Sequence, residues 1–231
     1  MNILRTAGVL ALFLGLGSSA LSADSAVGAY PAMAPLERYL SSSPTEEIAL
    51  ARSAAPASIS ADAEILTLSA KGYETAIKGK NHFVCLVVRP WDNHFDSPDF
   101  WNPKVRAPHC FNAPGARSVL PTYLQRTGWV LAGVSKAEMQ KRTEAALAAN
   151  KIPAPETGSI AFMMSKDGYL GDDAGGHWHP HLMFYLPRTA MVEWGANLKG
   201  SPVYGDADAL KPTTVFFVPV TRWSDGTAED K

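Results

Sequence analysis

Short apolar runs of strand length, separated by turn residues, place the strongest constraint on the fold of this chain. Three of them follow one another at residues 63–68, 73–77 and 83–89, with turn residues at 71–72 and 78–81. Apolar runs of this length that are bounded by glycine and asparagine are typical of β-strands. The pattern therefore predicts an antiparallel meander of three strands.

Three further apolar segments, at residues 160–164, 181–186 and 213–220, also predict strands. Their order along the chain does not show the strand–helix–strand alternation that indicates a parallel sheet. We therefore expect an α+β fold with a mainly antiparallel sheet and two or three helices. Residues 43–231 are expected to form a single domain of this class.

Two helices are predicted from the residues that cap their N-termini. Ser43 is followed by proline at the next position and by Glu46 three positions later, which is the capping-box pattern. We expect this helix to cover residues 44–53. The same spacing of serine and glutamate begins at Ser135 and predicts a second helix that ends near residue 150.

Two segments are expected to carry little regular structure. Residues 24–42 begin with mostly Ala, Ser, Gly and Pro and are expected to form a flexible or loosely docked N-terminal arm. Residues 90–121 contain many prolines and aromatic residues and are expected to form a long ordered loop.

The N-terminal residues have the pattern of an export signal. Residues 1–23 combine a positive charge at Arg5, an apolar stretch and a run of small residues, as a secretory signal peptide does. No other apolar run approaches the ~20 residues that a membrane-spanning helix needs. We therefore expect a soluble protein that is periplasmic or secreted and has no membrane span.

The charge balance of the chain does not favour nucleic acid as a partner. Lys and Arg number 21, Asp and Glu number 22, and the formal net charge at pH 7 is -1. A nucleic-acid-binding surface is built from clustered positive charge, and no such cluster stands out. The expected partner is a small molecule or another protein, of unknown identity.

The chain has two cysteines, Cys85 and Cys110. An even number of cysteines in an exported protein predicts a disulfide between them, and closing a loop of this size would stabilise the fold by about 3 kcal/mol. The alternative is that Cys85, which lies in an apolar run, is only a small buried hydrophobic residue.

Three of the six histidines lie within five residues, as His177, His179 and His181. Residues two apart in a strand share a face, so these imidazoles would point to the same side. At about 3.3 Å per residue the outer two Cα atoms would lie ~13 Å apart, whereas zinc binds nitrogen at about 2.0–2.1 Å. We therefore expect one histidine pair and a further ligand from elsewhere.

Asp173 is the carboxylate that we favour as this further ligand, because it lies close in sequence to the histidines. The reserve candidates are Asp172, His82, His94 and His109. The expected metal is zinc or copper, and an open coordination position would allow a bound water to be acidified for hydrolysis. The alternative is that the histidines only order a turn beside Trp178 and Pro180.

Motifs of several known chemistries are missing from the sequence. It contains no G-x-S-x-G, H-E-x-x-H, P-loop, G-x-G-x-x-G or C-x-x-C pattern. The spacing from Gly171 to the histidines is similar to the first metal motif of cupins, which are small β-barrels. The glutamate expected after His179 in that motif is absent here.

Four segments, at residues 51–56, 100–103, 163–166 and 177–187, resemble a group of uncharacterised exported bacterial proteins with an HWHPH segment. The resemblance covers most of the chain beyond residue 23. It implies export and a single domain, and it implies no activity or site residue.

Together these features predict an exported protein that binds a divalent metal, or a metal-dependent hydrolase, with its site at the HWHPH segment. The alternative is a non-catalytic periplasmic module that binds a small molecule or a partner. In that case we expect the aromatic loop around Trp91, Phe95 and Trp101 to provide the binding surface.

Overall fold

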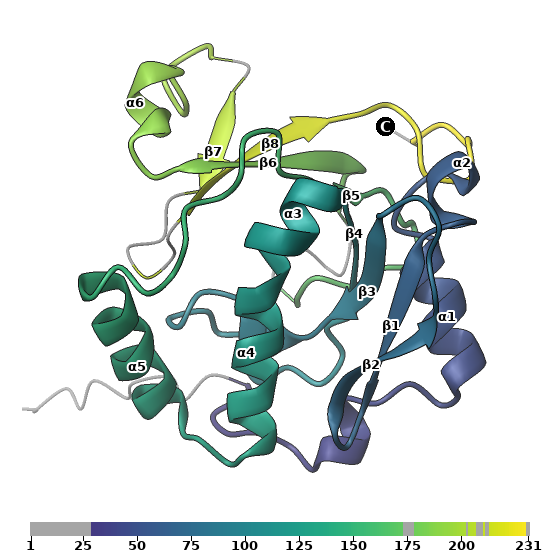
Figure 1. The fold of residues 1–231 in the computed structure, drawn as a ribbon, viewed down its shortest axis with the longest axis vertical. Coiled ribbons are helices and arrows are strands. Elements are labelled where there is room, and N and C mark those ends of the chain that lie inside the picture. Colours follow the sequence, from purple (N-terminus) through teal and green to yellow (C-terminus); the bar gives the residue numbers. More distant parts are fainter. Residues whose placement is uncertain (1–28, 173–177, 202, 207–209, 211–212, 230–231) are drawn as a thin grey trace, which may run out of the picture.

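The computed structural model describes residues 29–172, 178–201, 203–206, 210 and 213–229 (Figure 1). In this part of the chain one sheet is formed by β1 Glu64–Ser69, β2 Gly72–Ile77, β3 Val84–Val88, β4 Ala107–Phe111, β5 Ile160–Met163, β6 His181–Pro187, β7 Tyr204–Asp206 and β8 Thr213–Pro219. The strands lie in the order β2-β1-β3-β4-β5-β6-β8-β7. All neighbouring pairs are antiparallel except β1 with β3.

The helices of the described residues are α1 Pro44–Arg52, α2 Ala57–Ser60, α3 Ala113–Ser118, α4 Leu120–Leu131, α5 Lys136–Ala148 and α6 Ala190–Glu193, with 3-10 turns η1 Leu36–Arg38 and η2 Pro90–Asp92. The predicted α+β class and mainly antiparallel sheet are confirmed, in one compact domain. The six described helices exceed the two or three expected. None of them is long and apolar enough to cross a membrane.

The first three strands do not form the predicted meander. β1 and β2 form an antiparallel hairpin, but β3 lies on the other side of β1 and runs parallel to it. The chain crosses the start of β1 at Gly79, where a side chain would collide with the backbone of Glu64. The N–H of Lys80 donates to the carbonyl of Asp62 over 2.7 Å. Glycine therefore permits a crossing that strand periodicity alone does not reveal.

The two predicted helix caps are present. The hydroxyl of Ser43 accepts a hydrogen bond from the N–H of Glu46, and the hydroxyl of Ser135 accepts one from Glu138, each over 3.2 Å. These bonds satisfy backbone donors that a helix leaves without partners at its N-terminus. The carboxylate of Glu46 accepts from Ser42 instead of completing the capping box.

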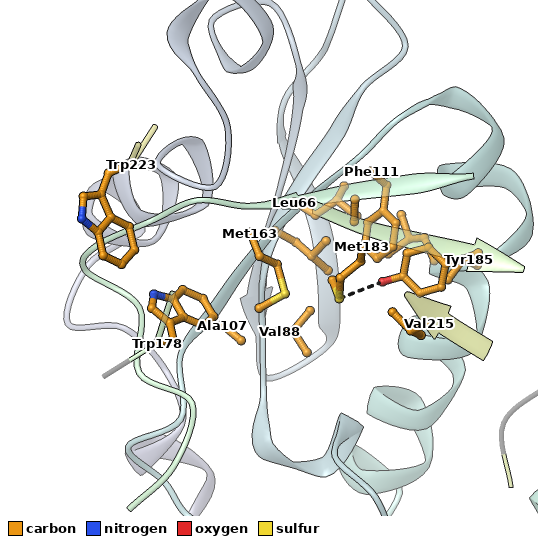
Figure 2. Close-up of a cluster of buried hydrophobic side chains, with 14 residues drawn as sticks. Leu66, Val88, Ala107, Phe111, Met163, Trp178, Met183, Tyr185, Val215 and Trp223 are labelled. Carbon is orange, nitrogen blue, oxygen red and sulfur yellow. Dashed lines mark hydrogen bonds between the residues drawn. The ribbon is translucent and has the colours of Figure 1, made fainter. Parts of the chain in front are cut away.

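Helices cover both faces of the sheet. Successive residues of β3 alternate between the faces: Cys85 packs in a cluster with Ala51 of α1, while Leu86 faces the side of α3 and α4. The larger core cluster lies on this second side and extends from Trp223 and Trp178 at one end to Tyr185 at the other (Figure 2). α6 packs against β6 and β8 on the face opposite to Tyr185.

The predicted disulfide is present. Cys85 of β3 and Cys110 of β4 are directly opposite each other in the antiparallel pair, and their sulfur atoms are bonded. Both residues are fully buried under α1. The cysteine pair therefore joins two central strands and also forms part of the core.

The prediction of a long loop over residues 90–121 is wrong, because β4 and α3 lie within it and α4 begins at its end. Two of its prolines occupy the first turns of α3 and α4, where a helix leaves its backbone N–H groups unbonded. Asn112 caps α3, since its side-chain oxygen accepts from the N–H of Gly115 over 3.0 Å. Prolines that suggested a loop therefore mark helix starts.

The described part of the N-terminal arm packs against the core. Tyr39 is fully buried, and its hydroxyl donates to the carbonyl of Trp101 over 2.8 Å. Its own carbonyl accepts from Nε of Arg89 over 2.7 Å. Arg89 also forms a buried ion pair with Glu47 of α1. The arm was expected to be flexible or loosely docked, but around Tyr39 it is an integral part of the packing.

Candidate functional site

His181 is the first residue of β6, where it pairs with Met163 of β5 and Pro219 of β8. Its Nδ1 lies 2.7 Å from the carbonyl oxygen of His179 and therefore donates its proton to that oxygen. The hydrogen bond fixes the tautomer, so the lone pair of the neutral ring is on Nε2. Burial lowers the pKa of His181 below its ordinary value, which favours this neutral form.

Nε2 of His181 is buried and has no hydrogen-bond partner among the described residues. The ring contacts two aromatic side chains edge-on, with centroid distances of 6.0 Å to Trp178 and 5.4 Å to Phe217. Aromatic carbon offers no hydrogen bond to this nitrogen. A buried acceptor without a partner destabilises the fold by about 1–3 kcal/mol, and such an atom in a native protein calls for an explanation.

His179 lies just before β6 and has an exposed side chain. Its Nδ1 forms a hydrogen bond with the carboxylate of Glu229, near the C-terminal end of the chain. Because a carboxylate accepts, Nδ1 carries the proton and donates it. Glu229 was not among the residues that the sequence singled out.

A turn brings Glu229 to this position. The side chain of Asp225 accepts from both the N–H and the hydroxyl of Thr227, and Gly226 adopts a positive φ of 86°. The chain then runs back, and the N–H of Glu229 donates to the carbonyl of Thr221 over 3.1 Å. The sequence signal for this return is the Asp-Gly pair, but it does not indicate which residue the returning segment meets.

These side chains line one open groove of about 600 Å³ on the surface. The groove is lined by Trp178, His179, His181, Tyr204, Phe217, Pro219 and Glu229, and we call it the histidine groove. It combines two imidazoles, one carboxylate and four apolar or aromatic side chains. The groove therefore has the chemistry to bind a metal ion or a ligand that accepts imidazole coordination.

His177 and Asp173, the other two predicted metal ligands, lie outside the described residues. Both flanks of their segment are held firmly. After it, the indole N–H of Trp178 donates to the carbonyl of Ser165 over 2.7 Å, and the ring packs where any side chain at Gly168 would collide with it.

Before it, the backbone N–H of Asp172 is 3.3 Å from a carboxylate oxygen of Asp99. A side chain at Gly171 would collide with that same carboxylate. Glycines 168 and 171 are therefore needed for close packing at the two flanks of the segment. The sequence showed the glycines but not what packs on them.

Three of the four reserve ligands are bound to other groups. Asp172 accepts hydrogen bonds from Tyr30, Tyr169 and Lys104, and these bonds hold the pKa of its carboxyl well below the usual range. His94 lies 2.7 Å from a carboxylate oxygen of Asp206. His109 is buried in β4, and its Nδ1 donates to the carbonyl of Ala107 over 2.9 Å. Neither these three side chains nor the exposed His82 lines the histidine groove.

Within the described residues there is no group of three or more His, Cys, Asp or Glu side chains placed to hold a metal ion. The groove supplies a histidine pair in which one ring is oriented by a carboxylate. Comparison of the chain with models of known protein families, with curated proteins and with solved structures gives no match. The groove must therefore be interpreted from its own chemistry.

The aromatic loop does not offer the surface that the alternative function requires. Trp91 is fully buried, and Phe95 and Trp101 are 5% and 8% exposed. The three rings pack in a second core cluster with Tyr39. They stabilise the fold and are not available to bind a partner at the surface.

Proposed function

We propose that the histidine groove binds a divalent transition-metal ion, zinc or copper, with His181 and His179 as ligands. The observation that carries the proposal is Nε2 of His181, a buried lone pair with no partner among the described residues. A metal–nitrogen bond would satisfy this atom. Imidazole nitrogen is a suitable ligand for both zinc and copper.

The hydrogen bonds around the two rings support the same assignment. Metal-binding histidines usually donate the other ring N–H to a carbonyl or a carboxylate, which orients the ring. His181 donates Nδ1–H to a backbone carbonyl, and His179 donates Nδ1–H to Glu229. In both rings Nε2 would then be the ligating atom.

The spacing of the two histidines suits a single ion. In extended backbone, residues two apart have Cα atoms about 7 Å apart. Two imidazoles on such a span can each reach one ion through Nε2 at about 2.0–2.1 Å. The proposal assigns the further ligand to Asp173, which lies five positions before Trp178 in the sequence. With one position left to water, the ion would acidify that water and support hydrolysis.

We also propose that the chain is exported, to the periplasm or to the outside of the cell, and that residues 1–23 are removed as a signal peptide. The disulfide between Cys85 and Cys110 supports export, because such bonds persist in oxidising compartments. The mass of the N-terminal peptide of the protein isolated from its host tests this part of the proposal. An intact Met1 or an intracellular protein would contradict it.

The metal proposal is tested on the full chain, purified from an oxidising compartment without a histidine tag. We expect stoichiometric zinc or copper by elemental analysis and a large loss of affinity in His181→Asn. The matched control is His82→Asn, since His82 is exposed, lies outside the groove and has a positive φ that asparagine tolerates. Absence of bound metal, or equal affinity in both variants, would exclude the proposal.

The hydrolytic extension has a separate test. The metal-loaded protein is assayed with activated carboxylic and phosphoric esters, and activity should disappear on chelation and return with the added ion. A protein that binds metal through His181 but shows no such activity would retain the binding site and lose the hydrolase assignment.

A further inference from the structure

A second cavity lies on the α4 side of the sheet, and its lining has no residue in common with the histidine groove. It lies between α4, α5 and the strands β6 and β8, and has a volume of about 60 Å³. Its lining includes Tyr123, Tyr185, Val215, Trp129 and Ile152, and we call it the tyrosine cavity. In Figure 2, Tyr185 and Val215 lie at the end of the core cluster opposite to Trp178.

Two tyrosine hydroxyls meet in this cavity. The oxygens of Tyr123 and Tyr185 are 3.3 Å apart, and the hydroxyl of Tyr185 also lies 3.7 Å from the sulfur of Met183. Burial raises the pKa of Tyr123 to about 12 and the pKa of Tyr185 well above its ordinary value. Both hydroxyls therefore keep their protons at neutral pH.

The hydrogen bonds of the pair leave a group available for a ligand. When Tyr123 donates to Tyr185 and Tyr185 donates to Met183, the oxygen of Tyr123 keeps lone pairs for which the described residues provide no donor. The bond to sulfur is weak, so Tyr185 can also turn to donate to Tyr123. The pair can therefore offer a ligand either an acceptor or a donor.

Among the described residues, the lining of the cavity has one positive and one negative side chain. Arg126 and Asp92 both line it and have opposite signs. The guanidinium of Arg126 is held by the protein itself, since Nη1 donates to the carbonyls of Trp91 and Asn93 and the group lies 4.4 Å from the ring centroid of Phe95. The described lining therefore has no excess of one charge that would favour an ion over a neutral ligand.

The size of the cavity restricts the ligand further. A volume of about 60 Å³ holds only a few heavy atoms, given that a cavity needs about 10–15 Å³ to hold one water. Ile152 also lines an outer groove of about 410 Å³, which is otherwise lined by Leu147, Asn150, Pro153, Ala154 and Arg188. With this groove the available volume falls in the ~300–1,000 Å³ range of small-molecule sites.

We propose that the tyrosine cavity and the outer groove form one binding site for a small neutral aliphatic molecule with a hydroxyl end group. The hydroxyl binds the Tyr123–Tyr185 pair, and the chain lies against Val215 and Ile152 and continues into the outer groove. This site is independent of the metal proposal, because none of its residues lines the histidine groove.

The test uses 1-butanol and 1-hexanol as probes, titrated into the full chain and followed by methyl and aromatic NMR shifts. We expect saturable shifts at Val215 and Ile152, with 1-hexanol binding about tenfold more tightly because two further methylenes are buried. Tyr123→Phe should weaken 1-hexanol about fivefold by removing one hydrogen bond. Ile152→Trp should place a larger ring at the residue that the cavity and the outer groove share, and should abolish binding.

Tyr169→Phe is the matched control, since Tyr169 is a partly exposed tyrosine that lines neither the tyrosine cavity nor either groove, and it should leave the affinity unchanged. Melting curves of each variant show whether it is folded, and Tyr123→Phe retains the ring that fills the core. The proposal is overturned if the shifts do not saturate, if both alcohols bind equally, or if folded Tyr123→Phe binds 1-hexanol as the unchanged protein does.

Discussion

Glu229 accepts a hydrogen bond from Nδ1 of His179, a residue 50 positions earlier in the chain. If the groove binds zinc, this carboxylate orients the ring and increases the basicity of its ligating nitrogen. Glu229→Gln should then lower the zinc affinity by about tenfold to 100-fold, measured by competition with a chromophoric chelator. Glu156→Gln, which removes an exposed carboxylate paired with Arg117, should leave the affinity unchanged; an equal loss there would exclude a specific role for Glu229.

The packing of Trp178 on Gly168 gives a prediction about stability. Gly168→Ala should lower the free energy of unfolding by about 1–3 kcal/mol, because the added carbon forces the indole ring to move. Gly128→Ala is the matched control, since no atom lies within 4 Å of a Cβ at that position in α4. It should stabilise the protein by up to about 1 kcal/mol. Chemical denaturation of both variants measures the difference, and a neutral Gly168→Ala would contradict the observed packing.

The buried tyrosines predict a loss of stability in alkali. A free tyrosine releases its proton near pH 10, whereas Tyr123 in the folded protein does so at about 12. Between these two values the unfolded chain binds fewer protons than the folded one, so the free energy of unfolding falls as the pH rises. Denaturation between pH 9 and about 12 measures the effect. In Tyr123→Phe the free energy of unfolding should decline less steeply with pH. An identical decline in this variant would refute the raised pKa of Tyr123.

Removal of the disulfide should destabilise the protein substantially. The double variant Cys85→Ala/Cys110→Ala loses the link between β3 and β4, and its free energy of unfolding should fall by about 2–4 kcal/mol. A reductant should destabilise the unchanged protein by a similar amount and leave the double variant unaffected. If the reductant lowers the free energy of unfolding of both proteins equally, the disulfide does not stabilise the fold as predicted.

The pattern of short apolar runs between turn residues was sufficient to locate most of the strands, because strands that are covered on both faces carry mostly apolar side chains. It did not indicate which strands are neighbours. The crossing at Gly79, which sets β3 beside β1, depends on a backbone contact with Glu64 that only the folded chain forms. Likewise α4 was missed because its proline and internal glycine resemble loop signals, although its apolar positions repeat at helical spacing.

In the candidate site, too, the sequence predicted the local arrangement but not the contacts between distant residues. Two of the histidines that were singled out, His179 and His181, do lie in one groove, as their spacing in the chain allows. Their partners were not foreseeable from spacing, since Glu229 arrives through a turn and the burial of Nε2 in His181 depends on rings from other elements. Local sequence predicts local geometry, whereas contacts between distant residues require the tertiary structure.

The buried position of Tyr39 determines where the smallest fragment that folds on its own can begin. A fragment that begins at Ser43 would lack the carbonyl that accepts from Nε of Arg89, and would leave a void where the tyrosine ring packs against Trp91. The guanidinium would then be buried with one donor unsatisfied, which is unfavourable in a low-dielectric interior. The protease-resistant unit of this protein should therefore start before Tyr39, within residues that the sequence alone assigned to an arm.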